Sequence, residues 1–455
     1  MPSIESPIKH DALSSLKRNL GMIETVGLST SIVAPTMAMS FTTVLTAQAA
    51  GRSVPLVFLL GTVMIAIVGL SFITLGKRFA HLGSIDTYVR SVFGVRAGFV
   101  TAWVLFFTYL MFTAVSVAMI GNFLSAAFAH FAIELPQMWL IATCLCALAI
   151  TWLAWYDIRI ATSWMLILEG GSILIILALA IVIFRGVGLS AIPFQVDRGY
   201  GWSGIGYGMA FSTLAFAGFE GAAAIGRETR QAQRTIPAAI LLAVCIAGVF
   251  YLIVSYAEVM GYGLNNIKAL ANADAPLDAL ATKYFSSKWA IAIDIAACLS
   301  AFAAALGCLS ATSRMLYSVG QYSEVAQSGM IEAICKTPRR AVLLGGGTSI
   351  AGLCVWGARY GASVYGGSVF GIGTLSLIVV YLAASLAAMV QSFRKREFFM
   401  GAVSLLGGLM LFWPLWNNLF PIPKWPGNIW PYIVMAWIVI GSYLSLFTAT
   451  ASSDT

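Results

Sequence analysis

The sequence predicts an all-helical protein that crosses a membrane twelve times, with two of its helices broken near mid-membrane. Composition, the lengths of the apolar runs and the helix-breaking residues inside two of them carry this prediction. Of the 455 residues, 60% are hydrophobic and 10% are charged, and the mean hydropathy is +0.88. Soluble domains carry about 25% charged residues and need polar groups over much of their surface. The composition therefore excludes soluble enzymes, nucleic-acid binders and disordered proteins.

Twelve apolar runs are long enough to be membrane spans, because a helix needs about 20 residues to cross a hydrocarbon core of about 30 Å. The runs lie near residues 21–48, 54–75, 97–129, 137–155, 160–184, 203–226, 236–262, 288–320, 340–359, 366–391, 398–418 and 428–449. Short tails, 1–20 and 450–455, flank them, and the first tail lacks the apolar segment of a cleavable signal peptide.

Lysine and arginine positions predict the orientation, because cytoplasmic loops of membrane proteins are enriched in these residues. With the N-terminus in the cytoplasm, 18 of the 26 basic residues fall on the cytoplasmic side and 8 on the outer side. We therefore expect a multi-pass protein of the plasma (inner) membrane with both termini in the cytoplasm.

Two spans contain features that break helices. In the first span, Gly27 and the hydroxyl residues after it loosen the helix, and Pro35 removes a backbone donor and clashes with the preceding turn. The sixth span holds glycines at 204, 206, 208, 218 and 221 and one acid, Glu220. Glycines at 204–208 are also explained by close helix packing. An acid inside an apolar run is costly unless it has a partner, so we expect the second break near Gly218.

The spacing of the two breaks predicts an internal repeat. The breaks centre near residues 32 and 216, about 184 residues apart, and the same offset carries the long third span onto the equally long eighth. Two five-helix units, 21–184 and 203–391, produce this pattern, with 398–449 outside the repeat. Because five is an odd number, the second unit is expected to be inverted in the membrane.

The backbone groups that are exposed where a helix unwinds at mid-membrane predict which kind of ligand binds there. The break leaves amides and carbonyls without intrahelical partners. The amides at a helix start bind an anion, whereas the exposed carbonyls accept hydrogen bonds from a cation. A zwitterion with adjacent carboxylate and ammonium groups satisfies both, which points to amino acids.

Four stretches resemble segments that are typical of the amino acid–polyamine–organocation transporters. They are HLGSIDTYVRSVFG (81–94), LAFAGFEGAAAIGRETRQAQRTIPAAI (214–240), SATSRMLYSVGQ (310–321) and TPRRAVL (337–343). The first resembles the family's loop after the second helix, and the second resembles its broken sixth helix. The resemblance implies the LeuT-type fold of five plus five inverted helices over residues 18–450, and secondary transport of amino acids.

The resemblance also implies the residues of a substrate site. Backbone amides near Ser31, Ile32 and Val33 would hold the substrate carboxylate. Carbonyls would hold the ammonium, and they belong to Ser29, Leu214, Ala215 and Ala217. Phe216 would help to close the pocket, and Tyr109 is a further candidate to line it. Glu220 would be either a proton-sensitive latch or a structural acid that fixes the unwound segment.

One departure from the family and two further residues bear on coupling. Some proton-coupled members of the family carry a lysine midway along the fifth helix, where this chain has Glu169 and no basic residue before Arg185. Glu169 is either a coupling acid or a polar partner between helices. Ser300 could line the place where sodium-coupled relatives of this fold bind sodium, although a hydroxyl in a membrane helix commonly bonds to a neighbouring carbonyl. Asp294, near a predicted membrane edge, is expected to be solvated.

The sequence predicts neither enzymatic activity nor a cofactor. The three histidines, His10, His81 and His130, are too dispersed to form a metal cluster with one another, and no metal site is expected. Transport would be driven by a proton gradient or by exchange. The alternatives are a transporter of polyamines or other organic amines, an ion channel or ion transporter on the same scaffold, and a membrane receptor or enzyme.

Overall fold

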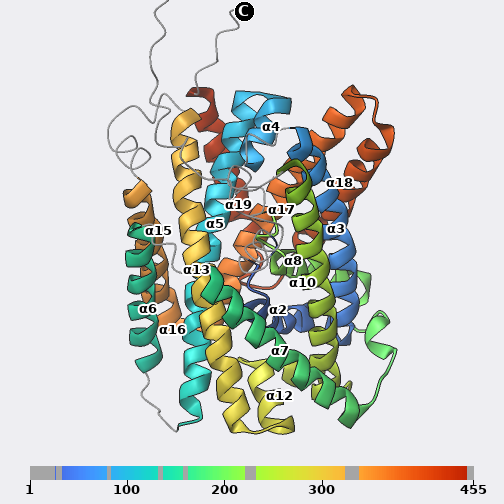
Figure 1. Ribbon diagram of the computed structural model, residues 1–455, viewed down its shortest axis with the longest axis vertical. Helices are drawn as coiled ribbons and strands as arrows, with labels where there is room; N and C mark the ends of the chain where they lie inside the picture. Colours follow the sequence, from blue (N-terminus) through green and yellow to red (C-terminus); the bar gives the residue numbers. More distant parts are fainter. Residues whose placement is uncertain are drawn as a thin grey trace, which may run out of the picture.

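The computed structural model describes residues 26, 33–78, 84–131, 137–156, 162–220, 232–322 and 338–447. Across these residues the fold is helical and contains no strand (Figure 1). Nine helical stretches of the described chain are long and apolar enough to cross a membrane, and one further apolar helix, Trp430–Leu444, is shorter. The predicted fold class is therefore confirmed. Because one of the nine, Pro35–Arg78, contains parts of two predicted spans, the count of twelve stays a prediction.

The described helices follow the predicted spans closely, because long apolar runs fix where a membrane helix lies. In chain order they are α2 (Pro35–Ala50), α3 (Val54–Arg78), α4 (Ile85–Phe93), α5 (Val95–Ala129), α6 (Met138–Trp155), α7 (Thr162–Val187), α8 (Gly201–Ala215), α10 (Ala232–Tyr262), α11 (Ile267–Ala271), α12 (Pro276–Tyr284), α13 (Ser287–Tyr322), α15 (Pro338–Gly352), α16 (Ala358–Tyr360), α17 (Ala362–Arg394), α18 (Phe398–Leu419) and α19 (Trp430–Leu444). A π-helical turn, η4 (Leu353–Gly357), joins α15 to α16.

The centre of the bundle is formed by α2 and α8, which lie between α3, α10 and α17 (Figure 1). The longest helices are α5 and α13, with 35 and 36 residues; they pack along each other, and α17 packs on α5. The pair α6 and α15 lies on one flank of the bundle, and α18 lies on the opposite flank (Figure 1).

Short helices mark the two ends of the bundle. One end carries α4, and the other carries α11 and α12 (Figure 1); we call them the α4 end and the α12 end. The sequence predicts a loop over 81–94, but 85–93 of it form α4. Its residues Ile85, Tyr88, Val89 and Val92 follow helical spacing and are buried, so an amphipathic face stabilises this helix against the bundle.

The helices α2 and α8 are about half as long as α5, and their position determines how deep in the bundle the candidate site lies. With 16 and 15 residues, each extends about 24 Å at 1.5 Å per residue, whereas α5 extends about 52 Å on the same basis. Both α2 and α8 lie in the middle of the bundle, where they pack against each other, and α2 also packs on α11 and α12 (Figure 1).

Candidate functional site

The start of α2 is a sharp break in the backbone. Ala34 adopts a left-handed conformation, with φ 48° and ψ 61°, and the helix begins at Pro35. A residue before proline is disfavoured in the helical region, and a non-glycine residue in the left-handed region is strained by about 1–2 kcal/mol. The predicted residues Gly27, Ser29, Ser31 and Ile32 lie outside the described part of the chain.

The first amides of α2 are held by side chains from two other helices. Thr36 N–H donates to Glu169 Oε1 of α7 at 2.8 Å, and Met37 N–H donates to Ser300 Oγ of α13 at 3.3 Å. Ala38 N–H donates to the carbonyl of Ala34 at 3.0 Å, and Pro35 has no donor. Every backbone donor in the first turn of α2 therefore has an acceptor, and Glu169 and Ser300 together act as a helix cap.

The end of α8 is a second break. The helix ends at Ala215, and residues 216–220 form turns instead of continuing the predicted span. Gly218 has φ 101°, a conformation that L side chains rarely adopt. The carbonyl of Leu214 accepts from Ala217 N–H at 2.8 Å, and the carbonyl of Ala215 accepts from the Tyr251 hydroxyl of α10 at 2.5 Å.

Glu220 holds the turn after α8 against two further helices. Its Oε1 accepts from the Tyr109 hydroxyl of α5 at 3.2 Å, and its Oε2 accepts from the Tyr381 hydroxyl of α17 at 2.9 Å. The backbone N–H of Gly218 also donates to Oε2, at 3.1 Å. Only 5% of Glu220 is exposed. Three donors around one buried carboxylate compensate for the water that it has lost.

Aromatic rings enclose the second break. Phe216 packs edge-on against Tyr251, with ring centroids 4.9 Å apart. Phe219 packs against Phe72 of α3 and Tyr381 of α17, both with centroids 5.6 Å apart. Phe216 and Phe219 are fully buried, as are Val33 and Ala34 at the first break to within a few per cent. The two breaks are therefore shielded from solvent in this structure.

The structure brings the predicted residues that it describes into two adjoining groups. Val33, Pro35, Glu169 and Ser300 gather at the start of α2, whereas 214–218, Glu220 and Tyr109 gather at the end of α8. Tyr251 of α10 belongs to the second group, because its hydroxyl donates to the carbonyl of Ala215.

Two residues that were not singled out in the sequence contribute to this region, and a third, on the same helix as Tyr251, is a buried acid. Tyr251 and Tyr381 bind the second break from α10 and α17, and no local pattern distinguishes them from the other tyrosines. Glu258 of α10 is completely buried, and neither of its oxygens has a hydrogen-bond partner among the described residues. The sequence could have identified Glu258 as a candidate functional residue, because it is an acid within the apolar run 236–262.

The expectation that Asp294 is solvated is wrong. Only 2% of the residue is exposed. It lies two helical turns into α13, where α12 packs on that helix. Hydropathy placed Asp294 near a membrane edge but carried no information about the short helix that covers it.

Comparison with known proteins identifies the family. A family model described as amino acid permease matches residues 20–453. The chain belongs to this family.

Among curated relatives, a branched-chain amino acid permease of Lactococcus lactis, BcaP, is 27% identical over 299 residues, which are 60% of this chain and 62% of that permease. A low-affinity putrescine importer of Escherichia coli, PlaP, is 20% identical over 65% of this chain and 66% of its own length. The matched region thus spans less than two thirds of either relative.

Two further comparisons cover more of the chain. An uncharacterized transporter of Mycobacterium tuberculosis is 26% identical over 389 residues, 83% of this chain and 81% of its own. The crystal structure of a manganese transporter of Eremococcus coleocola superposes with a TM-score of 0.60 at 13% identity, over 95% of this chain and 97% of that one. This structural likeness confirms the transporter fold that the sequence predicts.

Proposed function

We propose that this permease is a secondary active transporter that moves neutral amino acids across the cell membrane by alternating access. The observation that carries the proposal is the pair of half-helices, α2 and α8, whose inner ends lie at mid-depth in the bundle (Figure 1). A substrate between them is offered the positive end of α2 and the carbonyls at the end of α8. Those two ends complement the carboxylate and the ammonium group of one amino acid.

The substrate carboxylate is placed upstream of Pro35. The first-turn amides of α2 already donate to Glu169, Ser300 and Ala34, so the amides of Ser31, Ile32 and Val33 are assigned to the substrate. The ammonium is assigned to carbonyls of Ser29, Leu214, Ala215 and Ala217. A carbonyl has two lone pairs, so Leu214 and Ala215 keep an acceptor site beside the bonds that they already make.

The lining favours an uncharged side chain. Val33, Ala34, Leu214 and Phe216 are buried apolar residues at the two breaks. A polyamine would need carboxylates in place of these residues. The two carboxylates that bind the breaks, Glu169 and Glu220, are already occupied by donors of the protein. This occupancy supports an amino acid over a polyamine, even though one relative is named as a putrescine importer.

The two acids are proposed to connect the substrate site to the driving gradient. Glu169 joins α2 to α7, and Glu220 joins the turn after α8 to α5 and α17. A proton on either carboxylate removes acceptor capacity from its joint, which loosens a half-helix from its neighbours. In this proposal α2, α3, α8 and α10 rock against the rest of the bundle, with the α4 end in the cytoplasm.

Uptake by purified protein in proteoliposomes tests the proposal. The panel contains the twenty labelled amino acids and putrescine, with and without an inward proton gradient and with and without amino acid inside the vesicles. We expect saturable uptake of apolar neutral amino acids, stimulated by the gradient or by internal amino acid, and at least tenfold slower in Glu220→Gln. Saturable uptake of putrescine alone would replace the amino acid by an organic amine. Conductance without saturable uptake would indicate a channel and overturn the proposal.

A further inference from the structure

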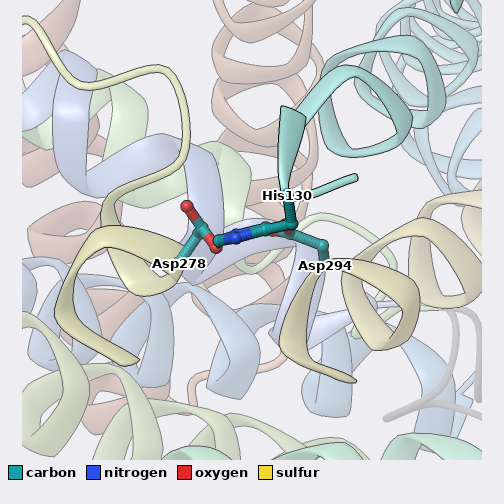
Figure 2. Close-up of side chains that lie close together, drawn as sticks. All are labelled: His130, Asp278 and Asp294. Atoms are coloured by element: carbon teal, nitrogen blue, oxygen red, sulfur yellow. The ribbon is translucent and has the colours of Figure 1, made fainter. Parts of the chain in front are cut away.

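Three side chains from three different elements meet at the α12 end of the bundle. His130 follows the last residue of α5, Asp278 lies in the first turn of α12, and Asp294 lies in α13. Figure 2 shows the three side chains close together, with Asp278 and Asp294 coming from different helices and the imidazole of His130 reaching the Asp278 carboxylate. One ligand atom of each residue lies within 4.8 Å of the other two. The cluster is separate from the breaks of α2 and α8 and has no part in the proposed substrate site.

Hydrogen bonds within the protein leave this cluster incomplete. His130 Nε2 and Asp278 Oδ1 are 2.6 Å apart, and their side chains are 15% and 19% exposed. Asp294 is 98% buried, and its Oδ2 has no hydrogen-bond partner among the described residues. An unpaired carboxylate oxygen in such a place is destabilising, and here it belongs to a side chain that points into the cluster (Figure 2).

The cluster also holds one more acid than it has bases. Two carboxylates approach one imidazole, which supplies at most one positive charge. In the part of the chain that the structure describes, neither aspartate forms an ion pair with a lysine or arginine. Lys283, on the same short helix as Asp278, donates instead to the carbonyl of Gly261 at 3.0 Å. A divalent cation would balance the two carboxylates and give Asp294 Oδ2 a partner.

We propose that His130, Asp278 and Asp294 form a binding site for a divalent transition-metal ion of the zinc type. One imidazole nitrogen with two carboxylate oxygens is a ligand set that suits such ions. Ligands that each lie about 2.0–2.2 Å from Zn²⁺ are roughly 3.0–3.5 Å from one another in tetrahedral geometry. The ligand atoms, between 2.6 Å and 4.8 Å apart, reach that spacing by small side-chain rotations. Solvent supplies the fourth ligand through the partly exposed face of His130 and Asp278.

The ion would fasten α12 to the long helices of the bundle. It would link the end of α5 and the body of α13 to α12, and α12 also packs on α2, α7 and α10. Among these, α2 and α10 belong to the part of the bundle that is proposed to move during transport. A metal at the cluster would therefore restrain that movement. This last step rests on the proposed function, whereas binding of the ion and stabilisation of the fold do not.

Metal binding is tested on full-length protein that carries no polyhistidine tag and has been freed of metal with a chelator. Titration calorimetry with ZnCl₂ is expected to show one site per chain, and saturating zinc is expected to raise the melting temperature by several degrees. Co²⁺, which substitutes for zinc, provides visible absorption bands as a second readout of an imidazole–carboxylate site.

Matched variants decide whether these residues form the site. His130→Ala and the near-isosteric Asp294→Asn are each expected to weaken zinc binding at least tenfold and to remove the thermal shift. His81→Ala removes a histidine outside the described residues and is expected to bind like the unmodified protein. Undetectable zinc binding by folded unmodified protein, or binding that survives in folded His130→Ala and Asp294→Asn, would overturn the site.

The effect on transport is measured separately, in proteoliposomes with zinc on the side that carries α12. Uptake that zinc slows severalfold in the unmodified protein, and leaves unchanged in His130→Ala, supports the restraint of α12. If zinc binds and uptake is unaffected, the restraint is overturned and the site stands. If zinc binds and no panel member is taken up, the proposed function fails and the metal site stands.

Discussion

At the scale of single residues, the interruption of the first span is made stable by acceptors from other helices. The start of α2 is buried, so water does not complete its hydrogen bonds, and Glu169 and Ser300 accept from Thr36 and Met37 instead. A carboxylate at a helix start also complements the helix dipole. Glu169 is therefore expected to stabilise the break regardless of any part that it plays in coupling.

Substitution of Glu169 separates these two roles. Glu169→Leu leaves the Thr36 amide without an acceptor, which should cost about 1–3 kcal/mol of stability and lower the melting temperature in detergent. Glu169→Gln keeps an amide oxygen that accepts the same bond, so its melting temperature should stay near that of the unmodified protein. If Glu169→Leu melts no earlier than Glu169→Gln, the bond to Thr36 is not what holds the start of α2.

At the scale of elements, α19 fits closely against α5. The indoles of Trp103 and Trp437 stack with centroids 4.5 Å apart, and each Nε1 donates to the other residue's carbonyl at 3.1 Å. Gly441 of α19 makes room for this arrangement, because a Cβ at that position would lie 2.3 Å from Trp103 Cδ1. The contact between the two helices therefore has no space for even one methyl group.

Gly441→Ala is accordingly expected to destabilise the protein by about 1–3 kcal/mol through overpacking. Gly347→Ala in α15 is the matched control, because a Cβ there meets no atom within 4 Å and alanine favours a helix. Thermal unfolding in detergent should show a lower melting temperature for Gly441→Ala and no loss for Gly347→Ala. Equal melting temperatures would mean that α19 is free to shift away from Trp103.

The helices and the breaks also show how much of the structure could be predicted from the sequence. Apolar run length predicted the long helices, and Pro35 and Gly218 predicted where the backbone departs from helix, because both signals are local. The partners of the breaks were not predictable in the same way: Tyr251 and Tyr381 act on residues 36 and 161 positions away. The short helices α4 and α12 were not predicted because neither is an apolar run. Because α12 covers Asp294, the burial of Asp294 was not predicted either.

At the scale of the whole molecule, the charge asymmetry predicts the orientation of the bundle. Of the 26 basic residues, 18 lie on the side predicted to be cytoplasmic. In the described structure this side carries α4 and the end of α17, whereas α12 and the start of α13 lie on the other (Figure 1). Lys395 and Lys288 are exposed residues at these two ends.

Accessibility of single cysteines tests the orientation. In a background with the seven native cysteines replaced, Lys395→Cys and Lys288→Cys are treated with a membrane-impermeant maleimide. Because basic residues are retained in the cytoplasm, Lys395→Cys should be labelled in inside-out vesicles and protected in right-side-out ones, and Lys288→Cys should show the reverse. Detergent-solubilised samples, in which both should react, control for thiols that are buried. The opposite pattern would invert the bundle and would place the α12 end, with its histidine and two aspartates, in the cytoplasm, where free zinc is scarce.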